Sequence, residues 1–413
     1  MDLELVTVGT ELLLGFTVDT NAADIARALA PVGARVVRKT TIGDDAPAIE
    51  DALRVALDRT GFVIVTGGLG PTRDDVTKRA AAAVFRAPLE VDTAYLETLR
   101  RWFDDLGRGP MPAANRSQAE IPRGATVLPN RWGTAPGLWL EDGQRVAVLI
   151  PGVPREMRKL MEHEVIPRIQ GRGKREGGSV IQSLTLRTTG VAESALAERV
   201  GELEDAIAPL TLAYLPSVLG VDLRLTAWDL AAIEATRLLE AAAARLAGVL
   251  GRDCYGRDDD DLAAVVLDRL RELGRRLAVA ESCTGGLLGQ RVTAIPGSSD
   301  TFVGGVIAYA NEVKIAQLGV SPELLERHGA VSEPVVRAMV EGARRTFGVD
   351  AAVGITGIAG PDGGTPEKPV GTVWLAAAGG GRVETLGRRM GGGREEIRAR
   401  SAQAALNLLR LLL

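Results

Sequence analysis

The sequence predicts an α/β protein in which two α/β domains are separated by a small α+β module. Three observations lead to this prediction. Strand-like apolar segments alternate with helical patterns over residues 1–170, and the same alternation returns over residues 258–413. The stretch between them has the order β-α-β-β-α. Alternating strands and helices are typical of parallel βαβ units, whereas the middle order is typical of an α+β fold.

The first domain is expected to contain strands at LELVTV (3–8), 34–39 and FVIVT (62–66), and helices at 21–30 and 47–59. Within GLWLEDGQRVAVLIPG (137–152), the pair Asp142-Gly143 separates two apolar runs and predicts a hairpin turn. Pro154 suits the first turn of a helix, which is expected over 154–170. These elements predict one α/β domain over residues 1–170.

The middle module begins after GRGKREGG (171–178), a glycine-rich and charged segment that is typical of a linker. It is expected to contain the strands VIQSLTLRTTG, LTLAYLP and VDLRLTAW, with helices near 192–205 and 230–250. This module, over residues 178–250, resembles a KH fold. Because its turns lack the Gly-x-x-Gly loop that clamps nucleic acid, we expect a structural module and no bound nucleic acid.

The C-terminal domain is expected to begin near the aspartate run Asp258–Asp261, which precedes an apolar helix and suits a helix cap. Its expected strands are RLAVAES, FVGGVIAY and DAAVGITG, and its last helix runs from about Arg394 to the end. Residues 258–413 are therefore predicted to form a second α/β domain.

Composition excludes several classes of protein. The formal net charge is -4 and no basic block stands out, which argues against a general nucleic-acid binder. The start MDLELVTVGT lacks the basic region of a signal peptide, and no apolar run reaches the roughly 18 residues of a membrane helix. We therefore expect a cytoplasmic protein without membrane contact. Two histidines, His163 and His328, leave little material for histidine-based catalysis or a zinc site.

The segment AESCTGG (280–286) lies where a strand runs into a helix, and it carries three candidate nucleophiles, Ser282, Cys283 and Thr284. Its two glycines permit a tight turn that leaves backbone amides free for an anion or a developing oxyanion. Serine and threonine are also common helix caps, so a purely structural role is the alternative.

Two further segments of this domain are candidates for the same site. GITGIAGPDGGTPEKPVGTVW (354–374) is a long loop rich in glycine and proline, and long loops in compact domains are usually functional or disordered. YANEVK places Tyr309, Asn311 and Lys314 at the start of a helix. A lysine acts as a base when desolvation lowers its pKa, although most lysines simply face solvent.

These segments, with PGSSDTFVGG, HGAVSEPVV and KPVGTVW, closely resemble the CinA C-terminal amidase family over residues 258–413. The resemblance implies hydrolysis of the carboxamide of nicotinamide mononucleotide to nicotinate mononucleotide and ammonia, without a cofactor. It implies that Ser282 attacks the amide carbon, that Lys314 is the base, and that Tyr309 relays a proton or orients the lysine. The amides of Gly285 and Gly286 would serve the oxyanion or the phosphate. The expected substrate-binding residues are Glu281, Thr284, Gly285, Gly286, Ser298, Ser299, Asn311, Thr356, Gly357, Gly360 and Gly363.

The neighbouring cysteine remains an alternative nucleophile. Cysteine is intrinsically more reactive than serine, but it usually requires a histidine or a helix dipole to form the thiolate. His328, in the matching segment HGAVSE, would be the partner of Cys283. We favour Ser282 with Lys314.

The N-terminal domain carries a second signature, VTVGTELLLG with DTN (6–21) and TGGLGPTRDDVT (66–77). The glycines permit close backbone approach to a phosphate. Asp74 and Asp75, expected in a first helical turn, would bind a divalent cation that bridges a pyrophosphate. The alternative is a Thr72 cap with favourable dipole charges.

With ANRSQAEIP (114–122), GTAPG (133–137) and PGVPREM (151–157), this signature resembles the molybdopterin-binding-like domain of CinA proteins over residues 1–170. The resemblance implies cleavage of ADP-ribose to AMP and ribose 5-phosphate, with a divalent metal of the magnesium or cobalt type and with potassium. The expected metal ligands are Asp74 and Asp75. The expected nucleotide-binding residues are Thr10, Glu11, Asn21, Gly67, Gly68, Gly70, Thr72 and Asn115.

Three functional hypotheses follow. The first is a bifunctional enzyme of pyridine-nucleotide recycling. The second is an amidase whose N-terminal domain only binds a nucleotide or pterin. The third is a competence or DNA-damage accessory protein that acts by interaction, although no DNA-binding face is evident. We expect small nucleotides as ligands and a homodimer.

Overall fold

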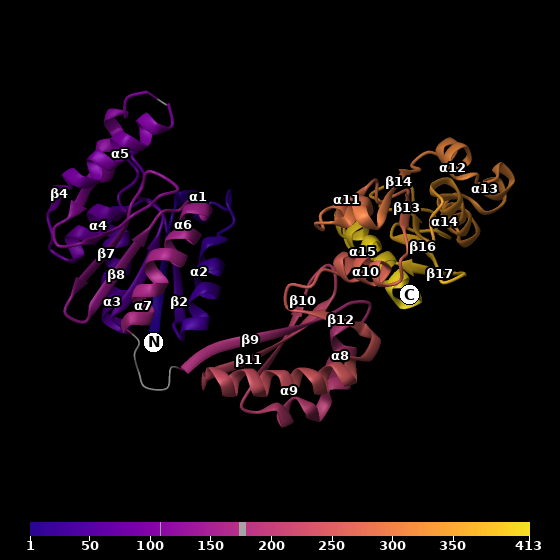
Figure 1. Cartoon of the computed structure of the whole chain (residues 1–413), viewed down its shortest axis with the longest axis horizontal. Helices are drawn as coiled ribbons and strands as arrows, with labels where there is room; N and C mark the ends of the chain where they lie inside the picture. The colour runs from indigo at the N-terminus through magenta and orange to yellow at the C-terminus, as the bar shows by residue number, and fades with distance from the viewer. Residues whose placement is uncertain (108, 173–178) are drawn as a thin grey trace. The chain divides into compact units, whose positions relative to one another are not determined.

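The computed structural model describes residues 1–107, 109–172 and 179–413. The chain divides into two compact units, residues 1–182 with 227–237 and residues 183–226 with 238–413, whose strands and helices are labelled in Figure 1. Gly171 and Arg172 of the expected linker belong to a helix, and residues 173–178 lie outside the described residues. Over the described ranges, no helix is long and apolar enough to cross a membrane.

The N-terminal sheet has the strand order β2-β1-β3-β8-β7-β6. The neighbouring strands β2, β1, β3 and β8 pair in parallel. Strand β7 pairs antiparallel with β8 on one side and with β6 on the other. The strands are β1 (Asp2–Val8), β2 (Arg35–Ile42), β3 (Phe62–Thr66), β6 (Thr126–Leu128), β7 (Gly137–Asp142) and β8 (Arg145–Ile150), and a separate ribbon pairs β4 (Leu89–Val91) with β5 (Glu120–Pro122). The predicted hairpin at Asp142-Gly143 is confirmed.

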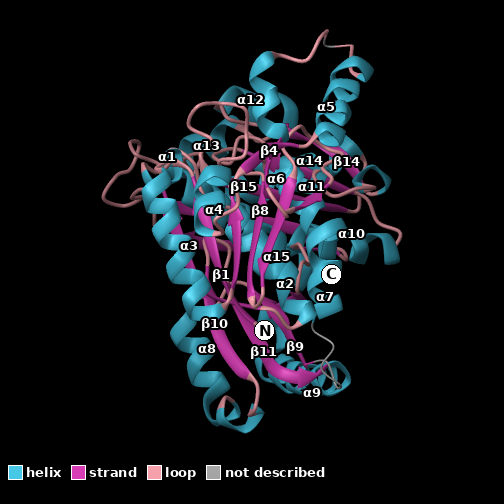
Figure 2. Ribbon diagram, turned by 90° about the vertical axis from the view of Figure 1, so that its left-hand side faces the viewer, coloured by secondary structure: helices cyan, strands magenta, loops and turns pink. Residues whose placement is uncertain are grey.

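Helices cover both faces of this sheet, which explains why the first four residues of FVIVT are all apolar. Ile64 points into a core with α2 (Asn21–Leu29), α6 (Pro154–Leu160) and α7 (Ile166–Arg172). Val63 and Val65 point into the opposite core with α3 (Ala46–Thr60) and α4 (Thr77–Val84). Figure 2 shows α3 and α2 on opposite sides of β1. The unit also contains α1 (Thr10–Leu13) and α5 (Thr93–Asp105). The helix expected over 154–170 is interrupted by a π-helical segment, Met161–Val165.

The middle module has the predicted order: β9 (Ser179–Thr188), α8 (Glu193–Val200), β10 (Thr211–Pro216), β11 (Val221–Ala231) and α9 (Ala232–Leu250). The helix expected near 192–205 ends earlier because Gly201 takes a positive φ of 46°. One strand was not predicted: β12 (Cys254–Arg257) pairs antiparallel with β9 and completes the sheet order β10-β11-β9-β12.

The C-terminal sheet has the order β14-β13-β15-β16-β17. Its strands are β13 (Leu277–Glu281), β14 (Phe302–Ile307), β15 (Ala351–Gly357), β16 (Thr372–Gly379) and β17 (Arg382–Arg389). Strands β14, β13 and β15 are parallel, so their carboxyl ends meet at one edge. Helix α10 begins after Asp261, which accepts a hydrogen bond from the Ala263 amide at 2.7 Å and confirms the predicted cap.

Two helical layers also enclose this sheet. One core contains α10 (Leu262–Glu272), α11 (Leu287–Thr293) and α15 (Arg394–Leu412). The other contains α12 (Asn311–Leu318), α13 (Pro322–His328) and α14 (Glu333–Phe347). Along β15, Val353 and Ile355 face the first core, whereas Ala352 faces the second.

The turn between β13 and α11 is organised by a buried carboxylate. Glu281 is 1% exposed and accepts hydrogen bonds from the amides of Gly286, Leu288 and Gly289 at 2.8–3.0 Å. Three amide donors compensate the desolvation of this carboxylate and hold the chain in one path. The expectation that Glu281 binds substrate is therefore wrong, because its oxygens are committed to the turn.

Glu281→Gln should destabilise the protein by about 1–3 kcal/mol, since the new amide group turns an N–H toward backbone donors that had a carboxylate acceptor. Chemical denaturation of the full chain measures the change. Glu326→Gln, at an exposed position of α13, is the matched control and should leave the unfolding curve in place. Equal stability of the two variants would show that the carboxylate does not hold the turn.

Candidate active site

The predicted nucleophile lies at the carboxyl edge of the C-terminal sheet. Ser282 follows the last residue of β13, and its amide donates to the carbonyl of Ile355 on the neighbouring strand at 2.9 Å. Its side chain is buried. Two strands therefore fix the backbone of Ser282.

Lys314, on α12, is 1% exposed although lysine is ordinarily a surface residue. Its Nζ lies 3.3 Å from Ser282 Oγ, 2.8 Å from the Ala308 carbonyl and 3.1 Å from the Tyr309 carbonyl. As a protonated amine, Nζ donates to all three oxygens; a neutral amine would keep two hydrogens for the carbonyls and offer its lone pair to the serine hydroxyl. Burial lowers the pKa of Lys314, which favours this neutral form.

Tyr309 contacts the lysine through its backbone and not through its phenol. The side chain is 62% exposed, and its hydroxyl accepts a hydrogen bond from Arg394 Nη2 at 3.3 Å. The expected orienting role thus belongs to the Tyr309 carbonyl. The phenol lines the mouth of the pocket beside Arg394, where it contacts substrate more readily than it relays a proton.

The turn amides differ from those expected for the oxyanion. The amide of Gly285 donates to the Ser282 carbonyl at 3.0 Å and that of Gly286 donates to Glu281, so neither is free. Among the contacts of the described residues, the amides of Cys283 and Thr284 have no backbone acceptor, and the Cys283 amide interacts with its own thiol. The amides of Gly285 and Gly286 are therefore not available to an oxyanion.

Arg398, on α15, fixes this turn from the other side. Its Nε and Nη2 both donate to the Thr284 carbonyl, at 3.2 and 2.7 Å. Thr284 itself is fully buried, and its hydroxyl has no partner in the described part of the chain. Thr284 is absent from the residues that line the pocket, so its expected role in substrate binding has no support from the geometry.

The surroundings of Cys283 oppose its use as a nucleophile. Its side chain is 5% exposed, and burial raises the pKa of its thiol to about 11. His328 is exposed at the end of α13 and is absent from the residues that line the pocket. His328 therefore does not reach the site as the partner that a cysteine mechanism was expected to use.

The pocket in front of Ser282 has a volume of about 270 Å³. The end of β15, the loop after it and the start of α12 supply the expected Asn311, Thr356, Gly357, Gly360 and Gly363. The alternative nucleophile Cys283 also lines the pocket, and the structure adds residues that were not singled out from the sequence: Ala330, Val331, Ile358, Ala359, Asp362 and Arg394.

Ser298 and Ser299 lie elsewhere. They precede β14, whose first residues pair with the start of β13, so they lie at the amino-terminal edge of the sheet. The site is at the opposite edge, and the expectation that these serines bind substrate is wrong. Arg394 was missed because it starts the final helix, far along the chain from every recognised segment, and only the fold brings it to the pocket.

A second pocket, of about 400 Å³, lies in the N-terminal unit at the carboxyl ends of β1, β3 and β8. It is lined by the expected Glu11, Gly67, Gly68, Gly70, Asp74 and Asp75. The other expected residues serve the scaffold. Thr10 donates twice to Asp44, Asn21 donates to the Gly152 carbonyl and Asn115 donates to Gln118.

The two aspartates lie in a turn and not in a helix, because α4 begins only at Thr77. Asp75 accepts hydrogen bonds from the amides of Gly70 and Thr72, at 2.7 and 2.8 Å, and from the Thr72 hydroxyl. The placement in a first helical turn is therefore wrong, and Thr72 supports Asp75 instead of capping the helix. Asp74 is exposed.

The lining of this pocket is strongly acidic. Glu11, Asp44, Asp74, Asp75 and Glu156 line it, and its lining includes neither lysine nor arginine. Burial raises the pKa of Glu156, whose carboxylate accepts from Asn130 Nδ2 at 2.6 Å. The described residues contain no group of three or more side chains arranged around one metal position. The donors fit a hard cation held by one or two carboxylates and by substrate oxygens.

Lys78, on α4, lies close to the residues that line this pocket, and it was not recognised from the sequence. It is 5% exposed, its Nζ donates to the Ser117 carbonyl, and burial lowers its pKa to about 8. Since Lys78 is absent from the lining of the pocket, it stabilises the segment 113–119 and does not bind the ligand directly.

Three family models match the chain. "CinA C-terminal domain" matches residues 259–413, "Probable molybdopterin binding domain" matches residues 4–171, and "Damage-inducible protein CinA KH domain" matches residues 183–256. The KH match agrees with the predicted and observed order of elements.

Curated relatives match over nearly the whole length. A CinA-like protein of Gemmatimonas aurantiaca is 55% identical over 412 residues, which is 99% of this chain and 96% of the relative. A CinA-like protein of Parasynechococcus marenigrum is 46% identical over 410 residues, with 99% and 96% covered. Among solved structures, the competence/damage inducible protein CihA of Agrobacterium tumefaciens is 42% identical, with 37% of this chain and 93% of that chain covered and a TM-score of 0.36. The chain belongs to the CinA family.

Proposed function

We propose that the C-terminal domain is an amidase that converts nicotinamide mononucleotide to nicotinate mononucleotide and ammonia. The observation that carries the proposal is the contact between Ser282 Oγ and the buried Nζ of Lys314. A serine becomes nucleophilic only when a base accepts its proton. A desolvated lysine held by two carbonyls is such a base, and the family resemblance supplies the substrate.

The first half of the reaction forms an acyl-enzyme. Lys314 accepts the hydroxyl proton as Ser282 Oγ attacks the carboxamide carbon, and the carbonyl oxygen becomes an oxyanion. The amides of Cys283 and Thr284, which have no backbone acceptor, follow the nucleophile directly and would stabilise this charge. Lys314 then gives the proton to the leaving nitrogen, the C–N bond breaks and ammonia leaves.

The second half reverses these roles with water. Lys314 accepts a proton from water, the hydroxide attacks the ester carbon, and the proton returns to Ser282 Oγ. The nicotinate carboxylate is released and the enzyme is restored. The same lysine thus serves both steps, as expected for a single general base next to the nucleophile.

The opposite side of the pocket is suited to the nucleotide. Arg394 lies at its mouth and donates to the Gly360 carbonyl at 2.6 Å, which leaves further guanidinium donors for a phosphate. Asp362 supplies a carboxylate for ribose hydroxyls. These two charges favour a ribose phosphate over an uncharged amide.

We propose a second activity for the acidic pocket, the cleavage of ADP-ribose to AMP and ribose 5-phosphate. Five carboxylates repel a pyrophosphate unless cations accompany it. Asp74 and Asp75 would hold a divalent metal, with potassium as a further cation. When bound, the metal would neutralise phosphate charge and polarise the P–O bonds. Glu156 is positioned to take a proton from water, and the backbone of Gly67–Gly70 approaches the phosphates.

Ser282→Ala should lower the kcat for release of ammonia from nicotinamide mononucleotide by several orders of magnitude, because the covalent route is removed. Cys283→Ala should remain within about tenfold of the parent, a barrier change near 1.4 kcal/mol. Ammonia release by the two purified variants measures both effects. An active Ser282→Ala enzyme, with inactivation by a thiol reagent that Cys283→Ala prevents, would assign the reaction to the cysteine.

The pH profile of the amidase should report Lys314. Its lowered pKa means that the neutral, basic amine forms at a lower pH than for free lysine. We therefore expect kcat/KM to rise with pH through an inflection below the ordinary value of 10.5 and then to level off. Lys314→Arg keeps a charge that cannot be lost and should be inactive throughout. A flat profile over the same range would remove Lys314 as the base.

Cleavage of ADP-ribose should require an added divalent cation. Asp74→Ala should abolish AMP formation and leave release of ammonia from nicotinamide mononucleotide unchanged, since the two pockets lie in different units. Asp104→Ala, which changes an exposed carboxylate on α5, is the matched control. Metal-dependent turnover by Asp74→Ala at the parental rate would exclude this carboxylate from the activity.

A further inference from the structure

A third pocket lies in the N-terminal unit, away from the acidic pocket. It has a volume of about 540 Å³ and is lined by residues of α3, the end of α4 and the β7–β8 hairpin. Arg145 is the first residue of β8, and β8 runs parallel to β3, so this pocket lies at the amino-terminal edge of the sheet. The acidic pocket lies at the carboxyl edge, so a ligand in one does not occupy the other.

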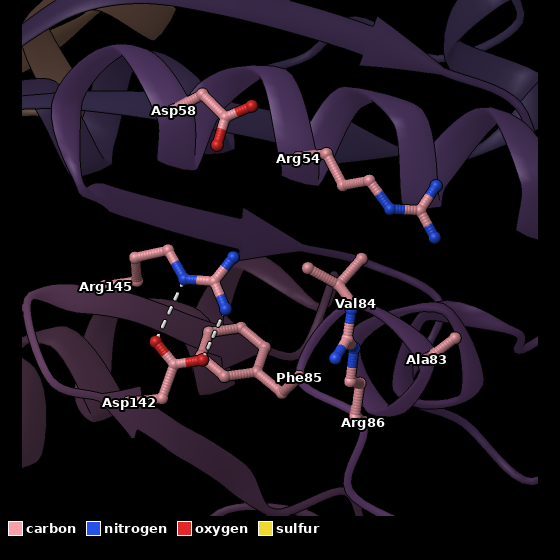
Figure 3. A pocket seen from close by; sticks show the side chains of 8 residues that line it. All are labelled: Arg54, Asp58, Ala83, Val84, Phe85, Arg86, Asp142 and Arg145. Atoms are coloured by element: carbon pink, nitrogen blue, oxygen red, sulfur yellow. Dashed lines mark hydrogen bonds and ion pairs between the residues drawn. The ribbon is translucent and has the colours of Figure 1, made fainter.

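Three arginines from separate parts of the chain line this pocket, as Figure 3 shows: Arg54, Arg86 and Arg145. Arg145 is held in place, since its Nε donates to Asp142 at 2.9 Å and its guanidinium lies 5.6 Å from the centre of the Phe85 ring. Arg54 donates one hydrogen bond to Glu50 at 2.8 Å. A guanidinium has five N–H donors, so most donors of this set are available to a ligand.

Arg86 is the most informative of the three. Among the described residues it forms no ion pair and donates no side-chain hydrogen bond. It follows Phe85, the C-cap of α4, at a φ of +51°, a position that glycine usually occupies after a helix. An arginine at a position that disfavours every side chain, and without a partner in the protein, is consistent with use of its guanidinium by a ligand.

The carboxylates of the pocket restrict the class of ligand. Asp142 is engaged by Arg145, whereas Asp58 faces the pocket from α3 and has no hydrogen-bond partner among the described contacts. A free carboxylate beside guanidinium groups repels a bare polyanion and accepts hydrogen bonds from hydroxyls. The combination suits a small molecule that carries one phosphate and several hydroxyls.

We propose that this arginine pocket binds a sugar phosphate or nucleoside monophosphate, with the phosphate on Arg86 and Arg54 and a sugar hydroxyl on Asp58. Guanidinium groups match phosphate oxygens in pairs, which gives orientation as well as affinity. The proposal does not depend on either catalytic activity.

Isothermal titration calorimetry of the full chain tests the site with three probes, ribose 5-phosphate, inorganic phosphate and ribose. EDTA is present, so that metal-assisted binding in the acidic pocket is suppressed. Ribose 5-phosphate should bind at least tenfold more tightly than phosphate, and ribose should not bind. Arg86→Gly keeps the backbone conformation favourable and should weaken both anions at least tenfold. Arg101→Ala, which changes an exposed arginine of α5, should stay within twofold.

Asp58→Ala gives a signature that a merely structural residue would not produce. Phosphate should bind more tightly because a repelling charge is gone, whereas the preference for ribose 5-phosphate over phosphate should disappear. The proposal is overturned if Arg86→Gly and Arg101→Ala bind ribose 5-phosphate like the parent, or if the parent shows no saturable binding. It is also overturned if the parent binds phosphate as tightly as ribose 5-phosphate.

Discussion

The buried carboxylate of Glu281 is the interaction on which the C-terminal site depends. Its three amide donors fold the segment after β13 into a turn that begins α11. That turn places Ser282 at the end of a central strand and leaves the next two amides without backbone acceptors. A carboxylate that resembles a binding group in the sequence is thus the internal anion that organises the turn beside the proposed nucleophile. Because this carboxylate already accepts from the amides at the start of α11, the phosphate of the proposed substrate would be recognised elsewhere, and Arg394 lines the same pocket.

Lys314 is a buried amine, and like the buried carboxylate it needs hydrogen-bond partners inside the protein. The two carbonyls that it contacts come from the segment between β14 and α12, where the backbone leaves the sheet. These carbonyls satisfy the hydrogens of a neutral amine, and the remaining lone pair meets Ser282 Oγ. A protonated amine at the same place has no carboxylate partner within hydrogen-bond distance among the described residues. Burial without a carboxylate partner therefore lowers the pKa of Lys314 and disfavours the protonated form.

Much of the fold was predictable from the sequence because both sheets bury two faces. Runs such as FVIVT and LAVAE are apolar at every position but the last and buried throughout, and the turn signal Asp142-Gly143 separates two further strands. The strand β12 was missed because CYGR is short and partly polar, and only its pairing with β9 makes it a strand. The π-helical segment was missed because MEHEV has the same apolar spacing as the helix around it.

The candidate site was predictable only as far as its residues lie in local motifs. Ser282, Lys314 and the glycine loop after β15 follow strands, and the carboxyl ends of parallel strands meet at one edge. Ser298 and Ser299 seemed equivalent in sequence, but they precede a strand and so fall at the wrong edge. Which amides are free depends on hydrogen bonds such as Gly285 to Ser282, and no residue type reveals this. Arg394 and Arg398 reach the turn across more than a hundred residues of chain.

The two proposed catalytic pockets have opposite electrostatic requirements: one needs an uncharged lysine and the other needs bound cations. Their placement in separate domains explains how one chain can contain both. The amidase pocket needs a dry, neutral amine, so it is built from backbone carbonyls and small residues with its charged groups at the mouth. The acidic pocket concentrates carboxylates and depends on added cations to admit a phosphate ester. Cations beside Ser282 would lower the pKa of Lys314 further. They would also attract water and phosphate to the turn. Because the pockets lie in separate domains, one can be apolar around the lysine while the other is rich in carboxylates and cations. A single cleft could not provide both environments.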